Sequence, residues 1–279
     1  MLPPDPPRQP KRILQLGRER VDEYAWMKDE RWREVLRDPA LLDPRIRGHL
    51  EAENAYADAL LASTAELQAM LFGEMRGRLK EDDSSVPFAD GPFEYFTAFA
   101  PGAEHPRHLR RPRGAEGPDT VLLDEAAEAA GKPYYSVGQA SHSPDHRLFA
   151  WTADDKGSEY YTLHLAELVS GERLPDGPAE TTGDFAFSPD SRWLYWIWRD
   201  ANARPSKVFR RPARGGEDVL IHAEADEGMF LGVGTTADRG YVVVTVQNQE
   251  TSEAWIIPAD DAAAAPILAE PRRVGVRYE

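Results

Sequence analysis

The stretch SPDHRLFAW, residues 143–151, returns 45 residues later as SPDSRWLYW, residues 188–196. A weaker third copy, TADRGYVVV, occupies residues 236–244, another 48 residues on. In each copy a turn built on Ser/Thr-x-Asp leads into a strand of aromatic and β-branched residues. A second apolar strand follows each copy after a short polar stretch. A repeat of this length with several strands is typical of a β-propeller blade.

Four such units account for most of the chain. The pattern predicts blades at residues 86–135, 136–180, 181–227 and 228–272, and it predicts that 274–279 begins a further blade. The sequence therefore indicates a mainly β fold, a partial β-propeller of about four blades. A closed four-bladed ring and a plain β-sandwich with coincidental SPD turns are the alternatives. Strand alternation places Trp196 and Trp198 on the same face of their strand, and we expect these side chains to pack between blades.

Residues 1–79 follow a different pattern and form a predicted N-terminal extension, so the propeller domain is placed at 80–279. The segment 44–71 is the clearest helix, because Asp43 suits the N-cap and Pro44 the first helical position. Apolar residues with helical spacing predict one buried face on this helix; they are Ile46, Leu50, Ala57, Leu61, Leu67 and Leu71. Two glycines in the seventies predict that the helix ends in the low seventies.

Composition excludes several classes of protein. The 279 residues include no cysteine, which rules out disulfides, thiolate metal sites and a cysteine nucleophile. The net charge is −15, and residues 1–80 are balanced with 14 basic and 14 acidic side chains, so the acidic excess lies in the propeller part. Such a charge disfavours nucleic acid and anionic membranes as partners. The sequence shows no secretory signal and no apolar run of about 18 residues, so a cytoplasmic location is expected.

Motifs for catalysis are absent. The sequence contains no G-x-S-x-G elbow, no H-E-x-x-H and no phosphate-binding loop. No catalytic residue, cofactor or metal ligand is therefore expected. His105 and His108 lie three residues apart, which permits a metal site. This spacing alone is weak evidence, so ordinary surface histidines are the favoured interpretation. The acidic stretch 81–83 is either a solvated linker or a hinge between the two parts.

Five stretches resemble the N-terminal half of the oligopeptidase B (protease II) branch of the prolyl oligopeptidase family of serine peptidases. They are RVDEYAWMKD (20–29), ENAY (53–56), RLKEDDSSVP (78–87), YTL (161–163) and GERLPD (171–176). The resemblance runs from about residue 8 to the end of the sequence. It implies an α/β-hydrolase domain capped by a seven-bladed propeller, with the N-terminal helical segment on the hydrolase side. It also implies that Lys80, Glu81, Asp82 and Asp83 form the hinge where the chain crosses into the propeller.

The same resemblance implies cleavage of short peptides after Lys or Arg by a Ser-Asp-His triad, without a metal or organic cofactor. The triad belongs to the C-terminal hydrolase part, and no position of this sequence corresponds to it. The chain alone is therefore expected to be inactive. The implied partners are basic oligopeptides and the missing hydrolase half, and exposed propeller surfaces suggest self-association. A free-standing propeller-type binding or scaffold module is the alternative function.

Overall fold

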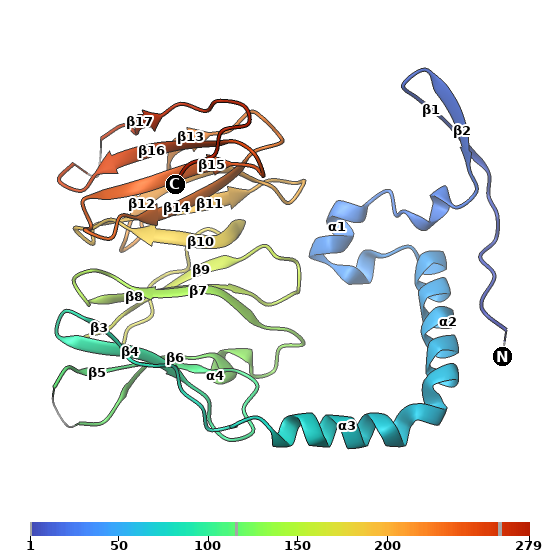
Figure 1. Ribbon diagram of the computed structural model, residues 1–279, viewed down its shortest axis with the longest axis horizontal. Coiled ribbons are helices and arrows are strands. Elements are labelled where there is room, and N and C mark those ends of the chain that lie inside the picture. Colours follow the sequence, from blue (N-terminus) through green and yellow to red (C-terminus); the bar gives the residue numbers. More distant parts are fainter. Residues whose placement is uncertain (1, 115–116, 262–263) are drawn as a thin grey trace. The chain divides into compact units, whose positions relative to one another are not determined.

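The computed structural model describes residues 2–114, 117–261 and 264–279. These residues divide into two compact units. The first unit comprises the described residues up to Asp83 together with Ala100–Gly102. The second comprises the described residues of Ser84–Phe99 and Ala103–Glu279. Figure 1 shows the helices of the first unit and the strand-rich second unit.

The first unit begins with an antiparallel hairpin and continues with helices. Its elements are β1 (Lys11–Gln15), β2 (Arg18–Asp22), η1 (Ala25–Met27), α1 (Trp32–Arg37), η2 (Pro39–Leu41), α2 (Pro44–Leu61), η3 (Ala62–Thr64) and α3 (Ala65–Gly77). The carboxylate of Asp43 accepts the N–H of Arg45 at 2.8 Å, and Pro44 occupies the first turn, which confirms the predicted start of α2. None of the described helices is long and apolar enough to cross a membrane.

The single long helix expected over 44–71 is wrong in two respects. A 3-10 turn at 62–64 separates α2 from α3, and α3 extends to Gly77. The predicted apolar face is also not buried within the described residues, because only Ile46 of that set is buried. Periodicity identifies a helix face that requires cover, but it does not tell which part of a protein supplies that cover.

The second unit consists of four antiparallel sheets in chain order. Sheet 1 contains β3 (Phe88–Asp90), β4 (Phe93–Ala98), β5 (Arg107–Pro112) and β6 (Thr120–Asp124), followed by α4 (Glu125–Ala129). Sheet 2 contains β7 (Ser136–His142), β8 (Leu148–Asp154) and β9 (Thr162–Glu167). Sheet 3 contains β10 (Thr181–Phe187), β11 (Trp193–Arg199), β12 (Pro205–Pro212) and β13 (Val219–Ala223). Sheet 4 contains β14 (Phe230–Thr235), β15 (Tyr241–Gln247), β16 (Ser252–Pro258) and β17 (Ile267–Glu270).

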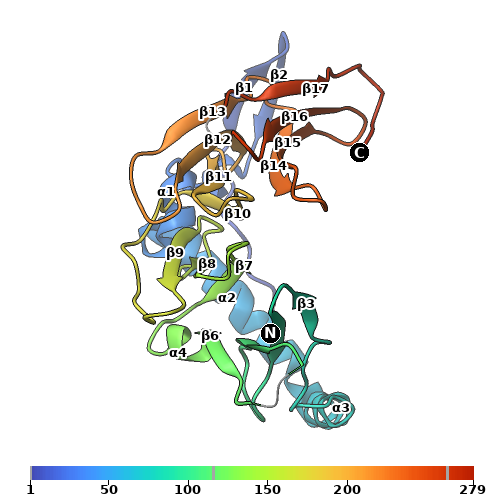
Figure 2. The ribbon, with the colours of Figure 1, turned by 90° about the vertical axis from the view of Figure 1, so that its left-hand side faces the viewer.

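Each sheet lies inside one of the four predicted blade ranges, so the partial propeller is confirmed. Each strand pairs with the next one along the chain, which is the connectivity of a propeller blade. The four sheets follow one another through the second unit in Figures 1 and 2, and the first strand of each sheet lies toward the inside of the arc that Figure 2 shows.

Sheet 2 has an irregular segment in place of a fourth strand. Leu174 N–H donates to the Leu165 carbonyl at 2.9 Å, and Gly177 N–H donates to the Leu163 carbonyl at 2.8 Å. Pro175 interrupts this ladder because it has no N–H to donate. The segment therefore follows β9 without forming a regular strand.

The repeated turn has one hydrogen-bond network in all three copies. The hydroxyl of its first residue donates to the carboxylate two positions on, at 2.5 to 2.6 Å. The same hydroxyl accepts the N–H of the strand residue five positions on, at 2.9 to 3.1 Å. The fourth turn residue has a left-handed backbone in each copy; these residues are His146, Ser191 and Arg239, with φ of 59°, 62° and 57°. The weak third copy is thus a true repeat.

The core consists of apolar layers between neighbouring sheets. Between sheets 2 and 3, Leu163 packs with Phe185 and Trp196. Between sheets 3 and 4, Ile197 packs with Val244. Because alternate side chains of β11 belong to different layers, the predicted use of its aromatic residues in packing between blades is confirmed.

The strand expected at 274–279 is not present. This segment has no regular strand, although it lies beside the start of β16. Ser252 N–H donates to the Val276 carbonyl at 3.1 Å, and Tyr278 N–H donates to the Ser252 hydroxyl at 2.8 Å. A continuous ladder would need more paired backbone groups than these contacts supply.

Candidate functional site

The predicted hinge residues Lys80, Glu81, Asp82 and Asp83 connect α3 to sheet 1 and are all exposed. Arg76 Nε donates to Glu81 Oε1 at 2.7 Å, and this hydrogen bond lowers the pKa of Glu81. Asp83 is the last residue of the main segment of the first unit. The four residues thus lie at a boundary between compact units, and their role as a hinge stays a prediction.

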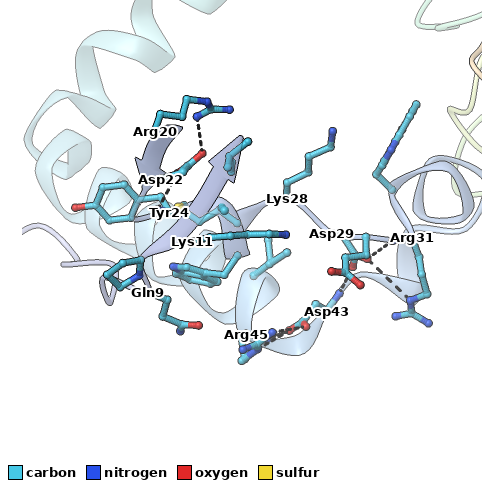
Figure 3. Close-up of a pocket in the computed structure, with 18 residues that line it drawn as sticks. Gln9, Lys11, Arg20, Asp22, Tyr24, Lys28, Asp29, Arg31, Asp43 and Arg45 are labelled. Atoms are coloured by element: carbon cyan, nitrogen blue, oxygen red, sulfur yellow. Dashed lines mark hydrogen bonds and ion pairs between the residues drawn. The ribbon is translucent and has the colours of Figure 1, made fainter. Parts of the chain in front are cut away.

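A wide pocket of 1460 Å³ lies within the first unit (Figure 3). The hairpin β1–β2, the turn η1 and the beginnings of α1 and α2 contribute to its lining, which includes Trp26, Trp32 and Ile46. Small-molecule sites measure about 300–1,000 Å³, so this hollow is large for a single small ligand. Its size favours contact with a polypeptide surface.

The carboxylates beside this pocket accept hydrogen bonds from nearby backbone N–H groups. Asp29 accepts the N–H groups of Asp43 and Arg31, both at 2.8 Å, and these bonds lower the pKa of Asp29 (Figure 3). The Arg45 guanidinium donates to Asp43 Oδ2 at 3.0 Å and lowers the pKa of that carboxyl. Asp43 therefore caps α2, whereas Asp29 fixes the backbone of the turns before α1 and α2, and the two are not poised as a general acid–base pair.

Large apolar side chains are exposed along α2 and α3. We call the following set the α2–α3 apolar surface: Leu50, Leu60, Leu61, Leu67, Met70, Leu71, Phe72 and Met75. Their exposed fractions range from 44% to 66%, which is unusual for so many apolar residues on two consecutive helices. A surface of this kind indicates an interaction site.

A second cavity, of 340 Å³, is lined by the first strands of all four sheets and the turns that follow them. Each sheet contributes at least one residue, for example Asp90 from sheet 1, His142 from sheet 2, Phe187 from sheet 3 and Arg239 after β14. In a propeller the first strands of the blades face the central channel. This cavity is therefore the part of the channel that the four blades enclose.

Polar and aromatic side chains gather at one end of this cavity. Asp90 ends β3, His142 ends β7, and His146 lies in the repeated turn of sheet 2. Nε2 of His142 lies 3.4 Å from Oδ2 of Asp90. The hydroxyl of Tyr95 lies 2.8 Å from Nδ1 of His146 and its ring stacks on that of His142 at 3.8 Å. Arg239, which also lines the cavity, pairs with Asp90.

Electrostatics in this cluster follow from partial burial. Burial lowers the pKa of His142, although a hydrogen bond to the Ser143 carbonyl and the charge of Asp90 oppose that shift. Burial raises the pKa of Tyr95, against the effect of the nearby Arg110. The phenol and the His142 imidazole are therefore both stabilised in their neutral forms.

No sequence motif marks this cluster. Its members are separated by up to 149 residues, as the pair of Asp90 and Arg239 shows, and only the order of the blades brings them together. The one available signal is that His146 and Arg239 occupy the same position of the repeat. By contrast, His105 and His108 both face Glu125, at 3.9 and 2.7 Å, instead of lying free on the surface as expected.

Comparisons with known proteins agree with this architecture. Residues 4–279 match the family model "Prolyl oligopeptidase, N-terminal beta-propeller domain". Dipeptidyl aminopeptidase BI of Pseudoxanthomonas mexicana is 32% identical over 296 aligned residues, which cover 99% of this chain and 40% of that protein. Protease 2 of Moraxella lacunata is 24% identical, over 94% of this chain and 38% of the relative. The structure of oligopeptidase B from Leishmania major superposes with a TM-score of 0.90 at 26% identity, covering 100% of this chain and 41% of that one.

The chain therefore belongs to the prolyl oligopeptidase family and contains its N-terminal β-propeller domain. The family match confirms the resemblance noted in the sequence. Oligopeptidase B of Trypanosoma brucei shares the fold, with a TM-score of 0.87. The chain spans about two fifths of the length of the relatives it matches.

Proposed function

We propose that this chain is the N-terminal and propeller portion of a serine oligopeptidase that cleaves short peptides after Lys or Arg. The observation that carries the proposal is the match of residues 4–279 to the propeller domain of a peptidase family, within relatives more than twice as long. In this arrangement the propeller admits and positions peptides, and a hydrolase portion performs the chemistry.

The chain is inactive alone under this proposal. Acyl transfer to a serine requires a nucleophile, a general base and oxyanion donors held in one site. The resemblance assigns all three to the hydrolase portion, and no residue of this sequence corresponds to them. The contribution of this chain is therefore binding, orientation and control of access.

The preference for basic peptides rests on charge. The whole net charge of −15 lies after residue 80, in the propeller part. A negative propeller attracts cationic peptides and raises their local concentration, and salt weakens that attraction.

The α2–α3 apolar surface and the wide pocket of the first unit serve, in this proposal, as the contact for the hydrolase portion. Relatives contain a further three fifths of polypeptide beyond the length matched here, which supplies an occupant of sufficient size. Each covered leucine contributes roughly 1.5–3 kcal/mol. Lys80, Glu81, Asp82 and Asp83 would then form the hinge between the hydrolase side and the propeller.

Co-purification tests the proposal. The hydrolase portion of dipeptidyl aminopeptidase BI is expressed with the tagged 279-residue chain, and we expect a complex that cleaves an Arg-containing fluorogenic peptide, whereas the chain alone does not. Leu50→Asp should abolish the complex. Ala52→Asp adds the same charge on the opposite side of α2 and should preserve it. Activity of the repurified chain alone, or a complex that Leu50→Asp does not weaken, would contradict the proposal.

A further inference from the structure

The arrangement of Asp90 and His142 has the spacing of two ligands on one metal ion. Ligand atoms about 2.1 Å from a tetrahedral ion lie about 3.4 Å apart. Nε2 of His142 and Oδ2 of Asp90 are 3.4 Å apart. A ligand atom of His146 completes a group in which all three atoms lie within 4.8 Å of one another. Two imidazoles and one carboxylate form a ligand set that zinc and other first-row divalent ions accept.

Hydrogen bonds orient both imidazoles for this role. Nδ1 of His142 lies 2.9 Å from the Ser143 carbonyl, which can only accept, so Nδ1 carries the proton and Nε2 presents a lone pair toward Asp90. Nδ1 of His146 lies 2.8 Å from the Tyr95 hydroxyl, which fixes the orientation of this imidazole. Histidines that bind metals usually have their second nitrogen engaged by an oxygen in this way.

The backbone holds His146 in place before any ion binds. Its φ of 59° is left-handed, and the conformation is held by the bond from its N–H to the Ser143 carbonyl at 2.8 Å. Arg110 donates to the His146 carbonyl at 2.9 Å. A Cβ at residue 91 would lie 2.5 Å from Nε2 of His146, so Gly91 leaves the space that this imidazole occupies.

We propose that Asp90, His142 and His146 bind one divalent first-row transition-metal ion, with Zn²⁺ as the representative. The ion joins the end of β3 in sheet 1 to the end of β7 and the following turn in sheet 2, beside the channel cavity. It is structural, and the peptidase chemistry proposed above does not depend on it. In the absence of metal, the guanidinium of Arg239 neutralises Asp90 and competes with the ion for the same carboxylate.

Titration of the metal-free 279-residue chain with Zn²⁺ tests this site. We expect one Zn²⁺ per chain by calorimetry and metal analysis, and a higher unfolding temperature when Zn²⁺ is bound. His142→Gln and His146→Gln should each weaken binding at least about 100-fold, since loss of a supporting hydrogen bond alone costs about 10- to 100-fold. Arg239→Ala should tighten binding because it removes the competing cation. Misfolding would weaken binding, so a gain in affinity shows that the substitution acts at the site itself.

His108→Gln is the matched control, because His108 also pairs with a carboxylate, that of Glu125, at 2.7 Å. It should leave the affinity for Zn²⁺ unchanged. The proposal is overturned if the chain binds no Zn²⁺ at micromolar concentration, if His108→Gln removes the bound ion while His142→Gln does not, or if Arg239→Ala weakens binding.

Discussion

Single residues at the ends of the first strands determine much of the local backbone conformation and packing. Gly91 combines a φ of +54° with the close approach of the His146 ring. Gly91→Ala should destabilise the fold by about 3 kcal/mol, because a left-handed alanine is strained and its Cβ displaces the imidazole. Gly131→Ala is the control, since Gly131 has a similar φ of +77° but open space around it. Urea denaturation should show the smaller loss for Gly131→Ala, and equal losses would refute the steric argument.

The carboxylates of the repeated turns predict acid sensitivity. Partial burial would raise the pKa of Asp190, but hydrogen bonds from the Ser188 hydroxyl and from Arg192 outweigh it, and the pKa is lowered. An unfolded aspartate titrates near pH 4. A pKa lowered in the folded state gives stability that is complete above about pH 4 and is lost as the pH falls through the folded value.

Asp190→Ala should therefore cost about 1 kcal/mol at pH 7 and less near pH 2, because the advantage of the charged wild-type carboxylate is lost as the pH falls toward its folded pKa. Unfolding free energies at the two pH values measure this difference. Asp155→Asn, at an exposed position, should have little effect at either pH. A penalty for Asp190→Ala that is the same at both pH values would show that the charge of the turn does not matter.

At the scale of elements, the sequence predicted strands better than helices. The repeated stretches predicted β8, β11 and β15, because strand period and aromatic or β-branched content agree there. The break at 62–64 was missed, since the apolar spacing continues across it without a proline or glycine. The cluster around His142 was missed for another reason: its contacts depend on the register between blades, and local periodicity does not encode that register.

Sheets 3 and 4 are joined by an ion triad that offers a further test. Arg272 pairs with Glu224 and with Glu253, at 2.5 and 3.1 Å, and both carboxylates are largely buried. Arg272→Met should cost about 3 kcal/mol, because it leaves two carboxylates without their cation. Arg273→Met is the control, since Arg273 forms an exposed pair with Glu270 at 3.2 Å. Thermal unfolding measures the midpoint temperature of each variant. An equal decrease for both variants would contradict this role of the triad.

At the scale of the whole molecule, charge and exposed apolar surface make separate predictions. The acidic propeller part should bind Lys/Arg-rich peptides weakly, and the affinity should fall steeply between low and about 0.5 M salt. A neutral peptide of equal length should bind less at low salt and show little dependence on salt. Fluorescence anisotropy measures both, and equal binding of the two peptides would remove the electrostatic argument.

The α2–α3 apolar surface predicts self-association of the chain when it has no partner. Apolar side chains on consecutive helices associate when nothing else covers them, and each buried leucine contributes roughly 1.5–3 kcal/mol. Light scattering should therefore show a mass that rises with concentration, and the double variant Leu67→Glu/Leu71→Glu should remain monomeric. Ala65→Glu/Gln68→Glu adds the same charge to α3, keeps the apolar residues and should still associate more than the leucine variant. If the wild-type chain stays monomeric at high concentration, the surface is not adhesive. If it associates and both double variants associate equally, exposed strand edges of the propeller cause the association instead.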